Sequence, residues 1–108
     1  MLNPQEVTRL LEECKQELDK VYGPRLKGVF LYGSYVRGEA VEGSDVDVAV
    51  VLDDFRNYWE EVKRTGPLMS RLSLQYGVSL SLFRIREREW HDRHSPILDN
   101  IRETALAA

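Results

Sequence analysis

Residues 30–51 read FLYGSYVRGEAVEGSDVDVAVV, and the architecture of the chain follows from the way this segment alternates between apolar and polar residues. The run Val29 to Tyr32 is continuously apolar, which predicts a strand covered on both faces. It stops at Gly33-Ser34, where a turn and a short helix are expected to follow. The residues from Asp45 to Leu52 are rich in valine and predict a second strand.

A helix is predicted before this segment. Asn3 has the side chain of a helix N-cap, Pro4 suits the first helical position because its missing N–H has no partner there, and Glu6 complements the helix dipole. The helix is expected to end near Gly23-Pro24. Its apolar residues fall at helical spacing, and they are Val7, Leu10, Leu11, Cys14, Leu18 and Val21.

Two helical pieces and a third strand are predicted after residue 54. Residues 55–76 have a helical pattern that Gly66-Pro67 is expected to break, since proline lacks the N–H group and restricts the residue before it. Residues 78–85 alternate in polarity and predict the third strand. Ser95-Pro96 predicts the start of a final helix, and the alanine-rich tail after this helix is expected to fray.

This order of elements predicts an α+β fold. We expect a mixed β-sheet of at least three strands, flanked by helices, in a single domain that spans residues 1–108. The chain has 108 residues, of which 43% are hydrophobic, so it has room for one core and little surface for a second module.

Charge and cysteine content narrow the classes of function. The formal charge of −3 gives no overall positive field, so binding to nucleic acid or to an anionic membrane is not expected. The single cysteine, Cys14, lies on the apolar stripe of the first helix, where we expect a buried and reduced thiol. The N-terminus has no secretory signal pattern and no apolar run has the length of a membrane span, so a cytoplasmic protein is expected.

Two short motifs are candidates for chemistry. Gly33-Ser34 ends a strand and begins a helix, so backbone N–H groups and the helix dipole can bind an anion there; the alternative is a turn with a geometric role only. Asp45 and Asp47 are two residues apart on a strand and therefore project from the same face. Two carboxylates that close together favour a bound cation, and Mg²⁺ suits them; the alternative is a solvated pair at a strand edge.

The two motifs form a larger pattern: Gly33-Ser34, ten intervening residues that include Arg37-Gly38, and then Asp45-x-Asp47. This pattern resembles the signature of the minimal nucleotidyltransferase (MNT) family of the polymerase-β nucleotidyltransferase superfamily. The apolar strand before the pattern and the valine-rich strand after it are similar too. The resemblance implies the nucleotidyltransferase (polymerase-β-like) fold over nearly the whole chain.

The resemblance also implies an activity, the Mg²⁺-dependent transfer of a nucleoside monophosphate, AMP from ATP, to a hydroxyl acceptor. It implies that Gly33 and Ser34 bind the β- and γ-phosphates and that Asp45 and Asp47 are catalytic metal ligands. Arg37 adds charge near the phosphates or is an exposed helix residue. Small nucleotidyltransferases of this kind pair with all-helical HEPN proteins as antitoxin and toxin, so the implied acceptor is a tyrosine of a HEPN partner. A homodimer also stays open.

The chain departs from the family pattern at the third strand. Active members carry a third carboxylate there, which completes a second metal site and activates the attacking hydroxyl, whereas this chain has Ser79 and Ser81 on the corresponding face. Three accounts stay open: another carboxylate substitutes, the acceptor or partner supplies the group, or catalysis is weak or absent. The candidate substitutes are Glu39, Glu42 and Asp53.

Two other functions stay open. The domain can be a catalytically weak or inactive nucleotidyltransferase-like binding module, which acts as the antitoxin partner of a HEPN toxin by association. A sugar-nucleotide glycosyltransferase also uses Asp-x-Asp with a divalent metal. That function leaves Gly33-Ser34 unexplained and usually needs a longer, two-domain chain.

Overall fold

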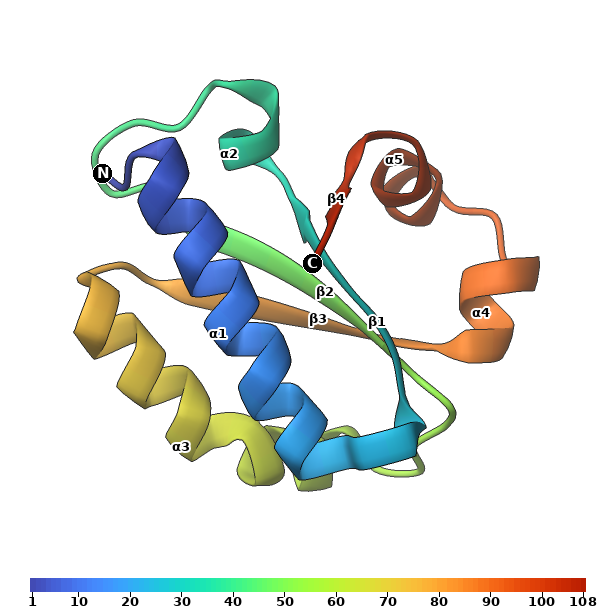
Figure 1. The fold of residues 1–108 in the computed structure, drawn as a ribbon. Coiled ribbons are helices and arrows are strands. Elements are labelled where there is room, and N and C mark those ends of the chain that lie inside the picture. The colour runs from blue at the N-terminus through green and yellow to red at the C-terminus, as the bar shows by residue number, and fades with distance from the viewer.

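A four-stranded mixed β-sheet forms the centre of the protein in the computed structural model, which describes residues 1–108 (Figure 1). The strands are β1 (Leu26–Tyr32), β2 (Val46–Leu52), β3 (Leu80–Arg86) and β4 (Leu106–Ala107), and their order in the sheet is β3-β2-β1-β4. β1 pairs antiparallel with β2 and with β4, whereas β2 and β3 are parallel. The predicted α+β fold with a mixed sheet is therefore confirmed.

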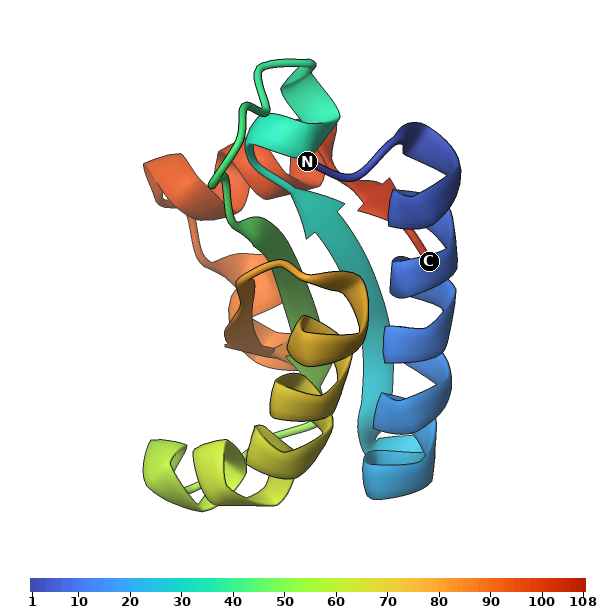
Figure 2. The same ribbon diagram turned by 90° about the vertical axis from the view of Figure 1, so that its left-hand side faces the viewer.

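Helices cover both faces of this sheet. The helices α1 and α3 lie side by side on one face, whereas α4 and α5 lie on the other (Figures 1 and 2). The helical elements are α1 (Pro4–Tyr22), the 3-10 turn η1 (Gly23–Arg25), α2 (Ser34–Arg37), α3 (Tyr58–Tyr76), α4 (Glu87–Asp92) and α5 (Pro96–Thr104). None of the helices has both the length and the apolar character that crossing a membrane requires.

The central strand β2 is almost completely buried because helices cover both of its faces. Its even-numbered residues pack against α1 and α3 in the larger apolar cluster. Ala49 and Val51 face the other way and pack against Ile85 of β3 and against Leu98 and Ile101 of α5. The continuous run of apolar residues in the sequence thus corresponds to a strand with two buried faces, as predicted.

The start of α1 is fixed by reciprocal hydrogen bonds. The Glu6 N–H donates to Asn3 Oδ1 at 2.8 Å, and the Asn3 N–H donates to Glu6 Oε1 at 3.0 Å, which together make a capping box. Cys14 on the inner face of α1 is fully buried, and burial raises the pKa of its thiol to about 12. The expectation of a buried, reduced thiol is confirmed, since such a group stays protonated and unreactive at neutral pH.

The prediction of two helical pieces in residues 55–76 is wrong. α3 is one helix from Tyr58 to Tyr76 with Pro67 in its interior. An interior proline costs a helix about 3 kcal/mol. Leu68 and Leu72, in the part of the helix that follows Pro67, are buried in the core with residues of α1, and this packing outweighs the local cost.

The prediction of a fraying tail is also wrong. Leu106 and Ala107 form β4, which pairs with Leu31 and Phe30 of β1. The Ala108 N–H then donates to the Val29 carbonyl at 2.9 Å. The physical reason is the free edge of β1, whose backbone groups gain partners from the tail irrespective of the tail's side chains.

Substituting Gly77 with alanine tests the end of α3. Gly77 caps the helix with φ of 65°. We expect Gly77→Ala to lower the free energy of unfolding by about 1–2 kcal/mol, because a side chain is strained in this left-handed conformation. Urea unfolding measures the change, and an unchanged free energy of unfolding would contradict the left-handed cap.

Candidate active site

The candidate site lies where the end of β1 meets the start of β2. The two strands are antiparallel, so Tyr32, the last residue of β1, pairs with Asp47 near the start of β2. The chain turns at Gly33 directly after Tyr32 and enters α2 at Ser34. The register of one strand pair therefore brings the glycine-serine turn and the aspartates together, although ten residues separate them in the sequence.

Gly33 lies directly against the Asp47 carboxylate. A Cβ at Gly33 would collide with Asp47 Oδ2 and would lie only 3.1 Å from Asp47 Cγ. The backbone of Gly33 also has φ of 84° and ψ of −152°, a conformation that side chains rarely allow. Glycine is thus needed at this position for two independent reasons.

The first amide groups of α2 have no acceptor within the helix. The Gly33 carbonyl accepts hydrogen bonds from the N–H groups of Val36 and Arg37 at 3.1 and 3.2 Å, which leaves the earlier amides of Ser34 and Tyr35 without an intrahelical partner. The Ser34 side chain does not cap the helix. Both the Ser34 hydroxyl and these amides are therefore in a position to bind an anion above the turn.

Asp45 and Asp47 lie close enough at the start of β2 for their charges to interact. Asp45 is exposed and precedes the strand, whereas Asp47 is partly buried within it. Burial raises the pKa of the Asp47 carboxyl, and the charge of Asp45 raises it further. The Arg37 guanidinium opposes both effects and lowers this pKa. The structure thus brings these three predicted site residues into one electrostatic environment.

Arg37 has a carboxylate partner of its own. Its Nε lies 3.2 Å from Glu39 Oε2 in an exposed ion pair. Exposed pairs of this kind contribute little to stability, so Arg37 can exchange Glu39 for another anion at little cost. Its effect on the pKa of Asp47 indicates that this positive charge also acts on the aspartate pair.

Ser81 takes the position beside Asp47 on the neighbouring strand. The two residues are partners in the parallel β2–β3 register, and the Val46 N–H donates to the Ser79 carbonyl at 2.9 Å. The two serines therefore flank the aspartates, as the alternation of residues 78–85 predicts. No group of three or more histidine, cysteine, aspartate or glutamate side chains is arranged to hold a metal ion.

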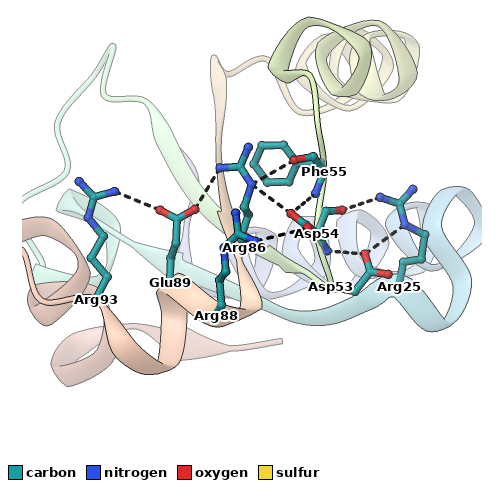
Figure 3. Close-up of polar contacts among 8 residues, drawn as sticks. All are labelled: Arg25, Asp53, Asp54, Phe55, Arg86, Arg88, Glu89 and Arg93. Atoms are coloured by element: carbon teal, nitrogen blue, oxygen red, sulfur yellow. Dashed lines mark hydrogen bonds and ion pairs between the residues drawn. The ribbon is translucent and has the colours of Figure 1, made fainter.

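The three acids considered as substitutes for a third carboxylate all have other partners. Glu39 pairs with Arg37, and Glu42 Oε2 lies 2.8 Å from the N-terminal amino group. Asp53 lies beyond the opposite end of β2, where its Oδ1 contacts Arg25 Nε at 3.1 Å (Figure 3). None of these acids joins the aspartate pair.

Asp53 belongs to an ion-pair network that ties together the far end of the sheet. Arg86 at the end of β3 contacts Asp54 Oδ1 and Glu89 Oε1, at 3.1 and 3.0 Å, and lies over the ring of Phe55 (Figure 3). The network joins the loop after β2 to the start of α4, which sequence reasoning did not predict as a helix.

Tyr32 belongs to the site, and sequence reasoning did not identify it. Burial, and secondly the charge of Asp47, raise the pKa of Tyr32 to about 12, so the phenol stays neutral beside the carboxylate. Its ring packs edge-on against Phe83 of β3, with 6.5 Å between centroids. The available signal was its place directly before Gly33, which in an antiparallel pair puts it opposite an early residue of the next strand.

The family model for the nucleotidyltransferase domain matches residues 7–101, which is most of the chain. The chain belongs to the nucleotidyltransferase domain family. It is similar to the protein adenylyltransferase MntA of Thermococcus cleftensis, with 48% identity over 75 residues that cover 69% of this chain and 74% of that protein. The chain is therefore a nucleotidyltransferase, and its resemblance to the minimal nucleotidyltransferases is confirmed.

Solved structures support the fold of this nucleotidyltransferase. A toxin–antitoxin structure with AMP-PNP is similar, with a TM-score of 0.58 and 20% identity over 98% of this chain and 72% of that chain. An MNT antitoxin in complex with a tri-AMPylated HEPN toxin of Shewanella oneidensis also has a TM-score of 0.58, with 18% identity over 94% of this chain and 70% of that chain. At these identities the likeness concerns the fold.

Two glycine substitutions test the contact between Gly33 and Asp47 in this nucleotidyltransferase. Gly38 also has a positive φ, 72°, but has open space around it. We expect Gly38→Ala to cost about 1 kcal/mol, and Gly33→Ala to cost about 1–2 kcal/mol more because of the collision. In an Asp47→Ala background this extra cost should disappear. Equal costs for the two glycines in urea unfolding would contradict the close contact.

Replacing Asp47 tests the electrostatic cost of the site. Because the folded-state pKa of Asp47 is raised, its ionised carboxylate destabilises the fold at neutral pH, and this penalty disappears as the pH falls through that pKa. Asp47→Asn should therefore raise the melting temperature of the ligand-free protein at pH 7, by the equivalent of about 0.5–1 kcal/mol, and should lose this advantage in acid.

Asp99→Asn is the matched control for that measurement. Hydrogen bonds from Arg102 and His94 lower the pKa of Asp99, so its charge stabilises the fold at neutral pH, and this contribution is lost as the pH falls. Thermal unfolding of Asp99→Asn should thus show a shift of opposite sign at pH 7. Destabilisation by both substitutions at pH 7 would contradict the assigned strain at Asp47.

Proposed function

We propose that this chain transfers AMP from ATP to a hydroxyl group of a protein acceptor in a Mg²⁺-dependent reaction. The observation that carries the proposal is the direct contact of Asp47 with Gly33, beside the free amides at the start of α2. An anion-binding turn and a pair of carboxylates then share one small region. Together they match the two parts of a metal-bound nucleoside triphosphate.

Asp45 and Asp47 fit the requirements of a Mg²⁺ site. Magnesium binds one or two protein carboxylates and completes its shell with water and phosphate oxygens. Burial and the charge of Asp45 raise the pKa of Asp47 in spite of Arg37, and a bound cation would oppose both effects. When bound, the metal neutralises phosphate charge and orients the triphosphate; the aspartates hold it on one face of the sheet.

Gly33 and Ser34 are the proposed binding site for the β- and γ-phosphates. The missing side chain of Gly33 lets the Asp47 carboxylate lie directly beside the turn, and the Ser34 amide and hydroxyl can donate to a phosphate oxygen above it. Arg37 is close enough to influence Asp47 and can add positive charge at the same place. These groups bind and orient the leaving group of the reaction.

The proposed transfer forms one bond and breaks one bond. The acceptor oxygen attacks the α-phosphorus, the bond from this phosphorus to the oxygen that bridges to the β-phosphate breaks, and pyrophosphate leaves. The hydroxyl proton passes to a base or to water. The residues of this chain contribute mainly by positioning, because Ser79 and Ser81 cannot act as an anionic base beside the aspartates.

The relatives support ATP as donor and a HEPN protein as acceptor. The T. cleftensis relative is a protein adenylyltransferase, one structural neighbour contains the ATP analogue AMP-PNP, and another contains a HEPN toxin modified with AMP. We propose the same donor and the same class of acceptor for this chain. A tyrosine of the HEPN protein is the acceptor hydroxyl in this proposal.

A second candidate function has one observation in its favour. Ser81 beside Asp47 leaves the chain without a third carboxylate of its own. A domain that binds the triphosphate and the HEPN protein without efficient transfer would act as an antitoxin by association alone. If Asp45→Asn with Asp47→Asn leaves inhibition of the HEPN protein intact, this candidate replaces the first.

Labelling with ATP tests the proposed activity. The protein is incubated with Mg²⁺, ATP labelled at the α-phosphate and a purified HEPN protein. We expect label in the HEPN protein and a loss of about a hundredfold or more in Asp45→Asn and in Asp47→Asn, because each removes a metal ligand. Asp53→Asn, at the far end of β2, is the control and should stay within about twofold of wild type. Equal labelling by Asp45→Asn would reject the site.

A further inference from the structure

The strand β3 forms an open edge of the sheet next to the candidate site. It is the outermost strand in the order β3-β2-β1-β4 and pairs only with β2, over seven residues. Figure 2 shows the helices on the two faces of the sheet. By contrast, β4 covers the free edge of β1 at the other side. An uncovered strand of this length is a template for pairing with another segment.

The register fixes which backbone groups of β3 point outward. Val46 pairs with Leu80, and the Val46 N–H donates to the Ser79 carbonyl, so the pattern of a parallel ladder assigns alternate residues of β3 to the β2 side. The residues whose N–H and C=O groups face β2 are Ser81, Phe83 and Ile85. The residues whose groups face outward are Leu80, Leu82 and Arg84.

The charged side chains of β3 do not shield this edge. Arg84 Nη2 donates to Thr65 Oγ1 at 2.7 Å, which draws the side chain across the face that α3 covers. Arg86 is drawn toward the loop after β2, where its Nε donates to Asp54 Oδ1 at 3.1 Å (Figure 3). The first half of the strand, which presents the outward backbone groups of Leu80 and Leu82, carries no charged side chain.

The open edge of β3 lies one strand away from Asp47. Ser81 is exposed, pairs with Asp47 and shares its face of the sheet. Strands in a sheet are about 4.8 Å apart, so a residue added opposite Ser81 would stand about 10 Å from the backbone of Asp47. A long side chain on that residue can cross over the small Ser81 toward the candidate site. A longer, acidic side chain at position 81 would block the space through which that side chain crosses.

The far half of the edge borders a groove of about 320 Å³ with an apolar and arginine-rich lining. Arg86 and Arg93 line it together with Glu89, which pairs with both of them. Arg84 also borders the groove, although its guanidinium contacts Thr65. Ile97 at its rim is an exposed large apolar side chain. These groups fit an extended segment that carries acidic and apolar side chains.

We propose that an extended segment of the protein acceptor, outside its helices, binds as an added β-strand along the open edge of β3. The acceptor hydroxyl lies opposite Ser81 and reaches over it to the aspartates, and acidic residues of the same segment lie in the arginine-lined groove. The proposal rests on the proposed function for the role of the hydroxyl. The strand pairing itself requires no transfer of AMP and is tested without nucleotide.

Amide hydrogen exchange in the wild-type protein tests the pairing. The probe is a nine-residue synthetic peptide with a central tyrosine, alternating valine and threonine residues and two glutamates at one end. On addition of the peptide, exchange at the amides of Leu80, Leu82 and Arg84 should slow at least about tenfold, because these N–H groups gain acceptors. The amides of Ser81, Phe83 and Ile85 should change little, since β2 already protects them.

A proline substitution on the edge provides a second test. Leu82→Pro removes an outward N–H without removing a bond to β2, a position at which edge strands tolerate proline. We expect it to weaken peptide binding by up to about tenfold, whereas Leu82→Ala, which loses the side chain and keeps the N–H, should bind like wild type. Equal weakening by both variants would assign the effect to the side chain and overturn the pairing.

Three other results of the exchange experiment would overturn the proposal. In the first two, the peptide slows exchange at β4 or at no strand. In the third, the amides of Leu80, Leu82 and Arg84 become more protected as the concentration of the peptide-free protein rises, because a second copy of the chain then occupies the edge. If Leu82→Pro does not fold, the wild-type exchange pattern decides. A peptide that protects β3 while ATP labelling fails would reject the proposed activity and leave the docking edge in place.

Discussion

The candidate site depends on one contact, the approach of the Asp47 carboxylate to the backbone of Gly33. This contact exists because β1 and β2 are antiparallel and Tyr32 pairs with Asp47, so the end of one strand lies beside the start of the next. A shift of the register by one residue would turn Asp47 to the other face and bury it against α1 and α3. The register is protected because every even-numbered residue of β2 is packed in that core.

Stability and function oppose each other at this end of the sheet. The fold holds a partly buried carboxylate next to a second negative charge, which raises the pKa of Asp47 and costs stability in the free protein. The rest of the molecule offsets this cost with a well-packed β2, a capped α1 and the ion-pair network at the far end of the sheet (Figure 3). The strain is a reason to expect a cation at the pair, because binding it relieves the repulsion.

Much of the fold and the main parts of the site follow from local sequence patterns. Asn3, Pro4 and Glu6 predict the start of α1, and the valine-rich segment predicts β2, since capping and burial act within a few residues. The unbroken α3 and the pairing of Leu106 with β1 depend on contacts distant in sequence, so neither was predictable from local propensity. The aspartates could be identified by their spacing; Tyr32 could not, because its place beside Asp47 depends on strand register.

The most direct measurement is a crystal structure with Mn²⁺, a non-hydrolysable ATP analogue and anomalous diffraction data. Manganese occupies oxygen-rich magnesium sites and is visible by its anomalous signal. The account predicts an anomalous peak between the carboxylates of Asp45 and Asp47, with the β- and γ-phosphates at Gly33 and Ser34. A peak at another cluster of acids, or phosphates bound away from α2, would contradict it.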